Sequence, residues 1–81
     1  MARRIYSGRE LVNALRKWGF APVDRTGSHV KLRYEHPDTG EVRNVTVPMD
    51  NELATGTLQS IAEQAGANDF QAFLDAVEDL V

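Results

Sequence analysis

The chain has 81 residues, 42% of them hydrophobic and 26% charged, which excludes a disordered or low-complexity chain and predicts one domain over residues 1–81 with a modest core. Its formal net charge is −3 and it has no cysteine, which excludes a disulfide scaffold, a thiolate zinc site and a cysteine nucleophile. Because no apolar run approaches a membrane span and the N-terminus lacks the apolar core of a signal peptide, we expect a cytoplasmic protein with no membrane partner.

The first predicted element is a helix over about residues 8–18. Ser7 and Glu10 have the spacing of a capping box, and Tyr6 and Leu11 flank it as a hydrophobic staple. Gly19 is placed to end the helix in a left-handed conformation. An apolar stripe recurs at helical spacing: Leu11, Ala14, Leu15 and Trp18. The polar face carries Arg9, Asn13, Arg16 and Lys17.

Three strands are predicted next, over residues 20–25, 28–35 and 41–48. Pro22 cannot donate to a ladder, so the first strand should lie at an edge or be irregular. Thr26-Gly27 is typical of a turn, and residues 36–40 of a hairpin loop with Gly40 in a left-handed position. The second strand alternates, with one face made of Val30, Leu32 and Tyr34 and the other of His29, Lys31 and Arg33.

Two more helices complete the chain. Thr55 or Thr57 is predicted to cap the first, which Gly66 ends, and Asn68 with Gln71 is predicted to form the capping box of the second, over about residues 68–80. The order α-β-β-β-α-α predicts an α+β fold, a two-layer sandwich with helices on one face of a three-stranded antiparallel sheet. The aromatic residues follow the apolar stripes, which indicates core packing rather than base stacking.

The charge is divided unevenly along the chain. Residues 1–34 have a net charge of +6, whereas residues 35–81 have −9. A basic half is compatible with one face that meets phosphate, and equally with ordinary surface charge in a small acidic protein.

A series of short motifs, in this order and spacing, resembles the HicA (YcfA-like) family of mRNA interferase toxins from type II toxin–antitoxin modules. The motifs cover about residues 6–66 and are Ser7 to Phe20, Gly27-Ser28-His29, His36 to Gly40, Val45 to Pro48 and Gly56 to Gly66. The resemblance implies a double-stranded-RNA-binding-like fold, endoribonuclease activity on mRNA and a HicB-type antitoxin partner. It also implies that His29 is the catalytic histidine.

The sequence departs from the family pattern at two places. Asp50 stands in the region where many members have a second histidine, and Gln59 and Glu63 occupy helix positions where members often have Arg or Lys. A non-catalytic RNA- or protein-binding module of the same fold is therefore the alternative function.

The residues around His29 suit cleavage of RNA by its own 2′-hydroxyl, which requires a base and cationic groups for the developing phosphorane charge. Neighbouring cations disfavour a charged imidazolium and so keep the ring able to accept a proton. A lone histidine on a polar strand face is also compatible with a solvated surface residue. The candidate RNA-binding residues are Arg25, Gly27, Ser28, Lys31, Arg33, Arg9 and Lys17.

The two histidines are not expected to act together. They are seven residues apart, which places them on opposite faces of a strand and about 23 Å from each other. With no cysteine and scattered acidic residues, the sequence predicts no metal site and no cofactor.

Overall fold

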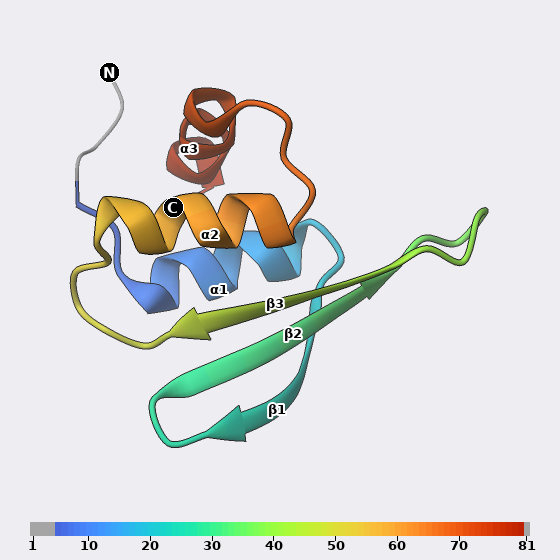
Figure 1. Cartoon of the computed structure of the whole chain (residues 1–81), viewed down its shortest axis with the longest axis horizontal. Helices are drawn as coiled ribbons and strands as arrows, with labels where there is room; N and C mark the ends of the chain where they lie inside the picture. The colour runs from blue at the N-terminus through green and yellow to red at the C-terminus, as the bar shows by residue number, and fades with distance from the viewer. Residues whose placement is uncertain (1–4, 81) are drawn as a thin grey trace.

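The computed structural model describes residues 5–80, which form three helices and three strands in the order α-β-β-β-α-α (Figure 1). Helix α1 spans Gly8–Lys17, α2 spans Thr55–Gln64 and α3 spans Phe70–Leu80. Strands β1, β2 and β3 span Ala21–Thr26, His29–Glu35 and Val42–Pro48, and they form one antiparallel sheet in the order β1-β2-β3. The predicted α+β class and element order are confirmed.

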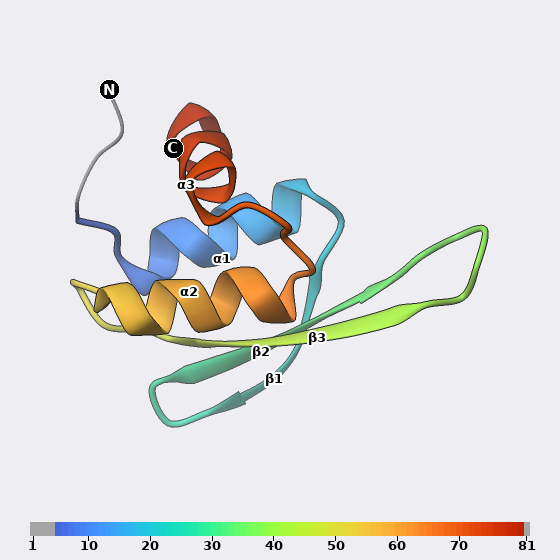
Figure 2. The same cartoon turned by 45° about the horizontal axis from the view of Figure 1, so that its top comes forward.

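The helices lie on one side of the sheet and leave its other face open (Figure 2). Helices α1 and α2 contact the strands, and α3 packs on these two helices. The buried face of β2 carries Val30 and Leu32, whereas His29, Lys31 and Arg33 are exposed on the opposite face, as the alternation predicts. The largest fully buried side chains of the core are those of Tyr6, Leu11, Leu15, Leu32, Val45, Val47, Ile61 and Val77.

The ends of α1 follow the sequence signals. The Ser7 hydroxyl accepts the N–H of Glu10, and the Glu10 carboxylate accepts the N–H of Ser7, so the predicted capping box is present. At the other end, Gly19 has φ +98° and the N–H of Phe20 reaches back to the carbonyl oxygen of Leu15. This left-handed residue ends the helix as expected.

The predicted caps of the other two helices are wrong. The N-cap of α2 is Ala54, which makes no side-chain cap bond, because the helix already includes both Thr55 and Thr57. The N-terminus of α3 is capped by Asp69, whose carboxylate accepts the N–H of Ala72 at 3.0 Å. Asp69 stands immediately before the helix, whereas Asn68 is one residue too early to reach that N–H.

Strand β1 is the exposed edge of the sheet. All six of its residues are exposed, and its pairing with β2 shifts between Pro22 and Asp24, which fits the irregular edge strand expected from the proline. At the other edge, the side-chain oxygen of Gln64 accepts the N–H of Thr46 at 2.9 Å. A residue of α2 therefore satisfies one backbone donor of the edge strand β3. The β2–β3 hairpin projects beyond the helices (Figures 1 and 2).

Candidate functional site

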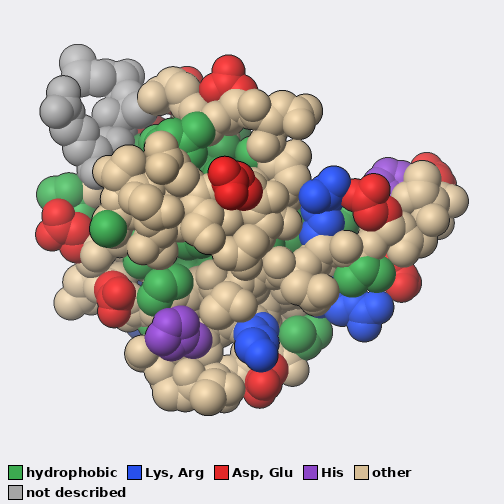
Figure 3. All heavy atoms as spheres, viewed as in Figure 1, with side chains coloured by type: hydrophobic (Ala, Val, Ile, Leu, Met, Phe, Trp, Pro, Cys, Tyr) green, Lys and Arg blue, Asp and Glu red, His purple; other side chains and the backbone are tan. Residues whose placement is uncertain are grey.

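The exposed face of β2 presents a histidine and two cations in a row. His29, Lys31 and Arg33 alternate with buried Val30 and Leu32, so the three polar side chains leave the same face of the sheet. Alternate residues of a strand are about 6.6 Å apart along its axis, which is close enough for one polyanion to contact all three. Figure 3 shows a histidine side chain and a Lys or Arg side chain over the strands at the lower edge of the view, with an acidic side chain just below the basic one.

A tight turn sets the position of His29. Thr26 pairs with His29 across the β1–β2 hairpin, so Gly27 and Ser28 are the only residues of the loop. Gly27 has φ +58°, while Ser28 is not among the positive-φ residues, a combination typical of a type II′ turn. A Cβ on Gly27 would meet nothing within 4 Å. The glycine therefore serves the backbone conformation, and the space around the turn is open.

Backbone hydrogen bonds fasten this end of the sheet to the helix layer. The N–H of Met49 donates to the carbonyl oxygen of Ser28 at 2.6 Å, and the N–H of Gly8 donates to that of Asp50 at 2.9 Å. Gly8 is buried so closely against β3 that a Cβ there would collide with the carbonyl oxygen of Pro48. Together these contacts hold the turn before His29, the end of β3 and the start of α1 in one rigid group.

The His29 ring has no hydrogen bond or ion pair with any other residue in the range 5–80. Its partners in register are Thr26 on β1 and Pro48 on β3. Neither neighbour has a titratable side chain, so neither adds a second acid or base beside the ring. The imidazole is exposed and available to a ligand.

The two cations of the row differ in their surroundings. Lys31 pairs in register with Asp24 and Thr46, and it forms no ion pair within the described part of the chain. Arg33 lies 3.8 Å from the Glu35 carboxylate, with both side chains more than half exposed. An exposed ion pair at this distance contributes little to stability. Both cations are therefore free to contact an incoming phosphate.

Arg25 lies on the other face of the sheet. It pairs in register with buried Val30, and directly paired residues share a face, so Arg25 belongs to the side that carries the helices. With Arg9 of α1 it lines a hollow of about 390 Å³, together with Ser7, Met49, Asp50 and Asn51. The candidate RNA contacts thus divide into an outer group on β2 and a second group on the helix side.

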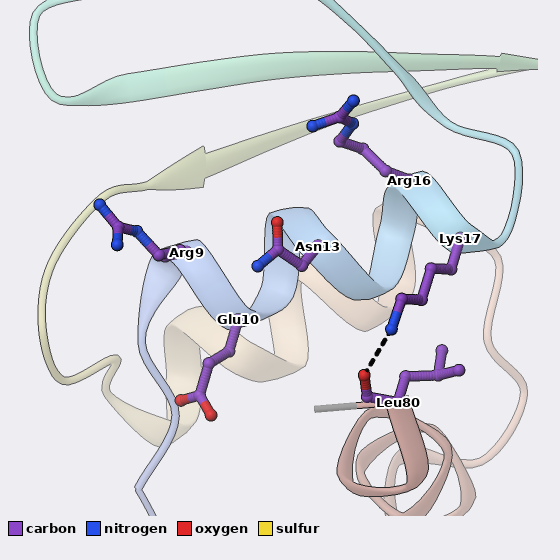
Figure 4. A pocket seen from close by; sticks show the side chains of 6 residues that line it. All are labelled: Arg9, Glu10, Asn13, Arg16, Lys17 and Leu80. Atoms are coloured by element: carbon purple, nitrogen blue, oxygen red, sulfur yellow. Dashed lines mark hydrogen bonds between the residues drawn. The ribbon is translucent and has the colours of Figure 1, made fainter.

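A second hollow of about 560 Å³ lies along the polar face of α1 (Figure 4). The side chain of Lys17 is engaged here, because its Nζ donates to the Leu80 carbonyl oxygen at 2.8 Å and so caps the end of α3. Arg16 stands seven residues after Arg9, so both lie on one side of the helix. In Figure 4 both arginines extend from α1 toward the strands.

The described residues offer neither a cluster of metal ligands nor a membrane-spanning helix. Among residues 5–80, no group of three or more His, Asp or Glu side chains is arranged to hold a metal ion. Over the same range, no helix combines the length and apolarity needed to cross a bilayer.

Comparison with known proteins identifies the family. A family model described as the HicA toxin of bacterial toxin–antitoxin systems matches residues 8–67. A comparison with curated proteins finds no match. The matched range runs from the first residue of α1 to just past α2 and includes the turn, His29 and the whole sheet, whereas α3 lies outside it. The chain belongs to the HicA toxin family and is the toxin of a toxin–antitoxin module, with an antitoxin as its partner.

Proposed function

We propose that this toxin is a metal-independent endoribonuclease that cleaves mRNA in the cytoplasm, with His29 as the general base. The observation that carries the proposal is the position of His29, whose exposed imidazole has no partner among residues 5–80 and lies between a tight turn and a row of cations. A base must reach the proton that it removes, and a polyanionic substrate needs cations beside it. Both requirements are met on one strand face.

The nucleophile in this mechanism comes from the RNA. His29 accepts the proton of a 2′-hydroxyl while the 2′-oxygen bonds to the adjacent phosphorus and the bond from phosphorus to the 5′-oxygen breaks. The 5′-oxygen then takes a proton from solvent. One fragment carries a 2′,3′-cyclic phosphate and the other a 5′-hydroxyl, so no water is consumed and no covalent enzyme intermediate forms.

The cations and the turn would stabilise the charge that develops on the phosphorane. Lys31 is the nearest cation on the face of His29, and Arg33 follows it. Ser28 offers a hydroxyl beside the ring, and Gly27 lets the RNA backbone approach closely because it has no side chain. Phosphate contacts of this kind position RNA without reading its sequence.

A HicB-type antitoxin would neutralise the toxin by covering the outer face of β2. The opposite face is occupied by the core, since Val30, Leu32 and Val45 are buried under the helices. Acidic or hydrogen-bonding groups of the antitoxin would sit against Lys31 and Arg33, and association would slow as salt rises. Amide hydrogen exchange of residues 27–34 should slow in the complex. Protection confined to α3 would contradict occlusion.

A non-catalytic RNA- or protein-binding module is the second candidate function. One observation favours it: His29 has no titratable neighbour in register on either side. A binding module would still use the cations of β2, but it would leave RNA intact.

The products of the reaction decide between the two functions. Purified toxin is incubated with single-stranded RNA in the presence of EDTA, and the ends of the fragments are identified. We expect 2′,3′-cyclic phosphate and 5′-hydroxyl ends, and we expect no cleavage at a position whose nucleotide is 2′-deoxy. Binding without cleavage would favour the module, whereas 5′-phosphate ends or cleavage at the 2′-deoxy position would refute the 2′-hydroxyl mechanism.

A further inference from the structure

The hollow on the helix side lies at the same end of the sheet as His29. It is formed by the start of α1, the end of β1 and the loop after β3, and we call it the Arg9–Arg25 hollow. Its volume of about 390 Å³ falls within the range of small-ligand sites and is sufficient for one nucleotide. It is therefore large enough to be a subsite rather than a shallow surface depression.

Its two cations are available to a ligand. Neither the Arg9 nor the Arg25 side chain is paired with a carboxylate of residues 5–80, and the nearby Asp24 carboxylate accepts the backbone N–H of Arg25 instead. Both side chains are exposed. A guanidinium matches the geometry of a phosphate oxygen pair, so two of them around one hollow favour a phosphate-bearing ligand.

The hollow also contains groups that a bare phosphate would not use. Asp50, which carries a carboxylate, and Asn51, which carries an amide, also line it, and the backbone of Asp50 is held in place because its carbonyl oxygen accepts the N–H of Gly8. A carboxylate repels an inorganic anion but accepts hydrogen bonds from the amino and imino groups of a nucleobase. A nucleotide therefore fits this mixture of groups better than a free anion.

The path between the hollow and His29 crosses the β1–β2 turn. Arg25 and Thr26 are adjacent on β1, yet Arg25 pairs with Val30 on the helix side and Thr26 pairs with His29 on the outer side. Only Gly27 and Ser28 separate the strands, and the space beside Gly27 is open. An RNA that touches both faces must bend around this turn, which a single strand can do and a stiff duplex cannot.

The polar face of α1 near α3 is less suited to continue that path. Lys17 is occupied by the end of α3, and the hollow there includes Glu10. Helix α3 itself carries Asp75, Glu78 and Asp79 and has no Lys or Arg. Phosphates beyond Arg9 would approach these acids, which favours a path toward Arg25.

We propose that the Arg9–Arg25 hollow is a nucleotide subsite: single-stranded RNA bends over the Gly27-Ser28 turn, places a neighbouring phosphate on Arg9 and Arg25, and offers its base to Asp50 and Asn51. The proposal rests on the proposed function and adds a second contact surface to it. It assigns phosphate binding to the arginines and base preference to Asp50.

Binding of an uncleavable 2′-O-methyl single-stranded RNA tests the subsite, with affinity measured by fluorescence anisotropy at several salt concentrations. The double variant Arg9→Ala/Arg25→Ala should bind about tenfold more weakly, and its log–log salt slope should fall by about 1.4, the value for two lost phosphate contacts to a single strand. The control is Arg16→Ala, which removes one positive charge from α1 outside the hollow, as Arg9→Ala alone does within it. It should change the affinity by less than about twofold.

Three further results complete the test. The same RNA annealed to its complement should be nearly insensitive to the double variant. Asp50→Asn should alter the relative affinities for RNAs that differ in one base by roughly severalfold, as expected for one changed hydrogen bond, with no loss of salt slope. In the wild-type chain, the backbone amide signals of residues 25, 50 and 51 should shift on titration with the RNA, a measurement that needs no variant.

The subsite is overturned if the double variant keeps the wild-type affinity and slope while Lys31→Ala loses both. It is also overturned if Arg16→Ala weakens binding as much as the double variant, if the duplex loses as much affinity as the single strand, or if the double variant impairs only the complex with the antitoxin. Because the probe cannot be cleaved, these outcomes are independent of catalysis. A wild-type chain that binds RNA through the hollow without cutting cleavable RNA would refute the proposed function alone.

Discussion

Strand β2 has a histidine at each end, and the structure places the two rings in different settings. His29 begins the strand at the end that is fastened to α1, and its ring is exposed without a partner among the described residues. His36 follows the strand at the projecting end, and its Nδ1 accepts the N–H groups of Asp38 and Thr39 at 3.1 and 3.3 Å. One ring faces solvent from a rigid support, while the other supports its own loop.

The two residues are of the same type, so the difference between their settings comes from the backbone around each ring. At the His29 end, backbone hydrogen bonds from Met49 to Ser28 and from Gly8 to Asp50 hold the chain in place. The His29 ring is therefore not needed to hold the turn. The hairpin end has no helix beside it (Figure 1), so the His36 ring contributes to local stability. Four comparisons between matched variants test this interpretation.

The largest expected effect is on cleavage. His29→Ala should lower the initial rate of RNA cleavage by about 10²-fold or more, the usual contribution of a general base, without unfolding the protein. His36→Ala is the matched control, and it should stay within about twofold of wild type. Equal rates for the two variants, either both low or both unchanged, would contradict the assignment of catalysis to His29.

The next effect concerns the support beneath His29. Gly8→Ala should reduce the free energy of unfolding by about 1–3 kcal/mol, because the added methyl group collides with the backbone of β3. Gly56→Ala is the control within helix α2. Nothing lies within 4 Å of a Cβ there, so this change should stabilise the protein by up to about 1 kcal/mol. Urea unfolding of the two variants should therefore move in opposite directions, and a stable Gly8→Ala variant would show that the junction is loose.

A smaller effect separates the two cations beside His29. Lys31→Ala should weaken RNA binding by roughly severalfold and lower the log–log salt slope by about 0.7, as expected for one lost contact to a single strand. Arg33→Ala should have the same direction but a smaller size, because Arg33 lies two residues farther along β2 from His29 than Lys31 does. Anisotropy titrations at several salt concentrations measure both slopes. An unchanged slope in each variant would place the RNA elsewhere.

The smallest effect is at the far hairpin. His36→Ala removes an acceptor of two backbone N–H groups and should destabilise the loop by about 1 kcal/mol. His36→Asn keeps an oxygen that can accept the same groups, as asparagine does in turns, and should retain most of the stability. Faster amide exchange of Asp38 and Thr39 in the alanine variant alone would support this role. Equal exchange in both variants would assign the loop's stability to Pro37 and Gly40 instead.

Local signals in the sequence predicted most of the elements because the physical causes are themselves local. The Ser7–Glu10 capping box, the left-handed Gly19 and the alternation along β2 involve residues within a few positions of one another. The predictions from sequence were wrong for two helix N-caps, where neighbouring residues could each have been the cap. Asp69 caps α3 in place of Asn68, and α2 begins at Thr55 after an uncapped Ala54, because packing of each helix decides its first turn.

Local patterns are enough to predict the order of the elements, the family motifs and the shared face of His29, Lys31 and Arg33, since a strand's period of two follows from its backbone geometry. That Arg25 lies on the opposite side of the sheet and lines the same hollow as Arg9 depends on the register of β1 and on where α1 starts, which are set by packing. Likewise, Lys17 and Arg9 are both cations on the polar face of α1 in the sequence, but packing of α3 brings the Leu80 carbonyl oxygen to the Lys17 ammonium. Contacts between segments that are distant in the sequence arise from packing, so they cannot be predicted from the spacing of residues along the chain.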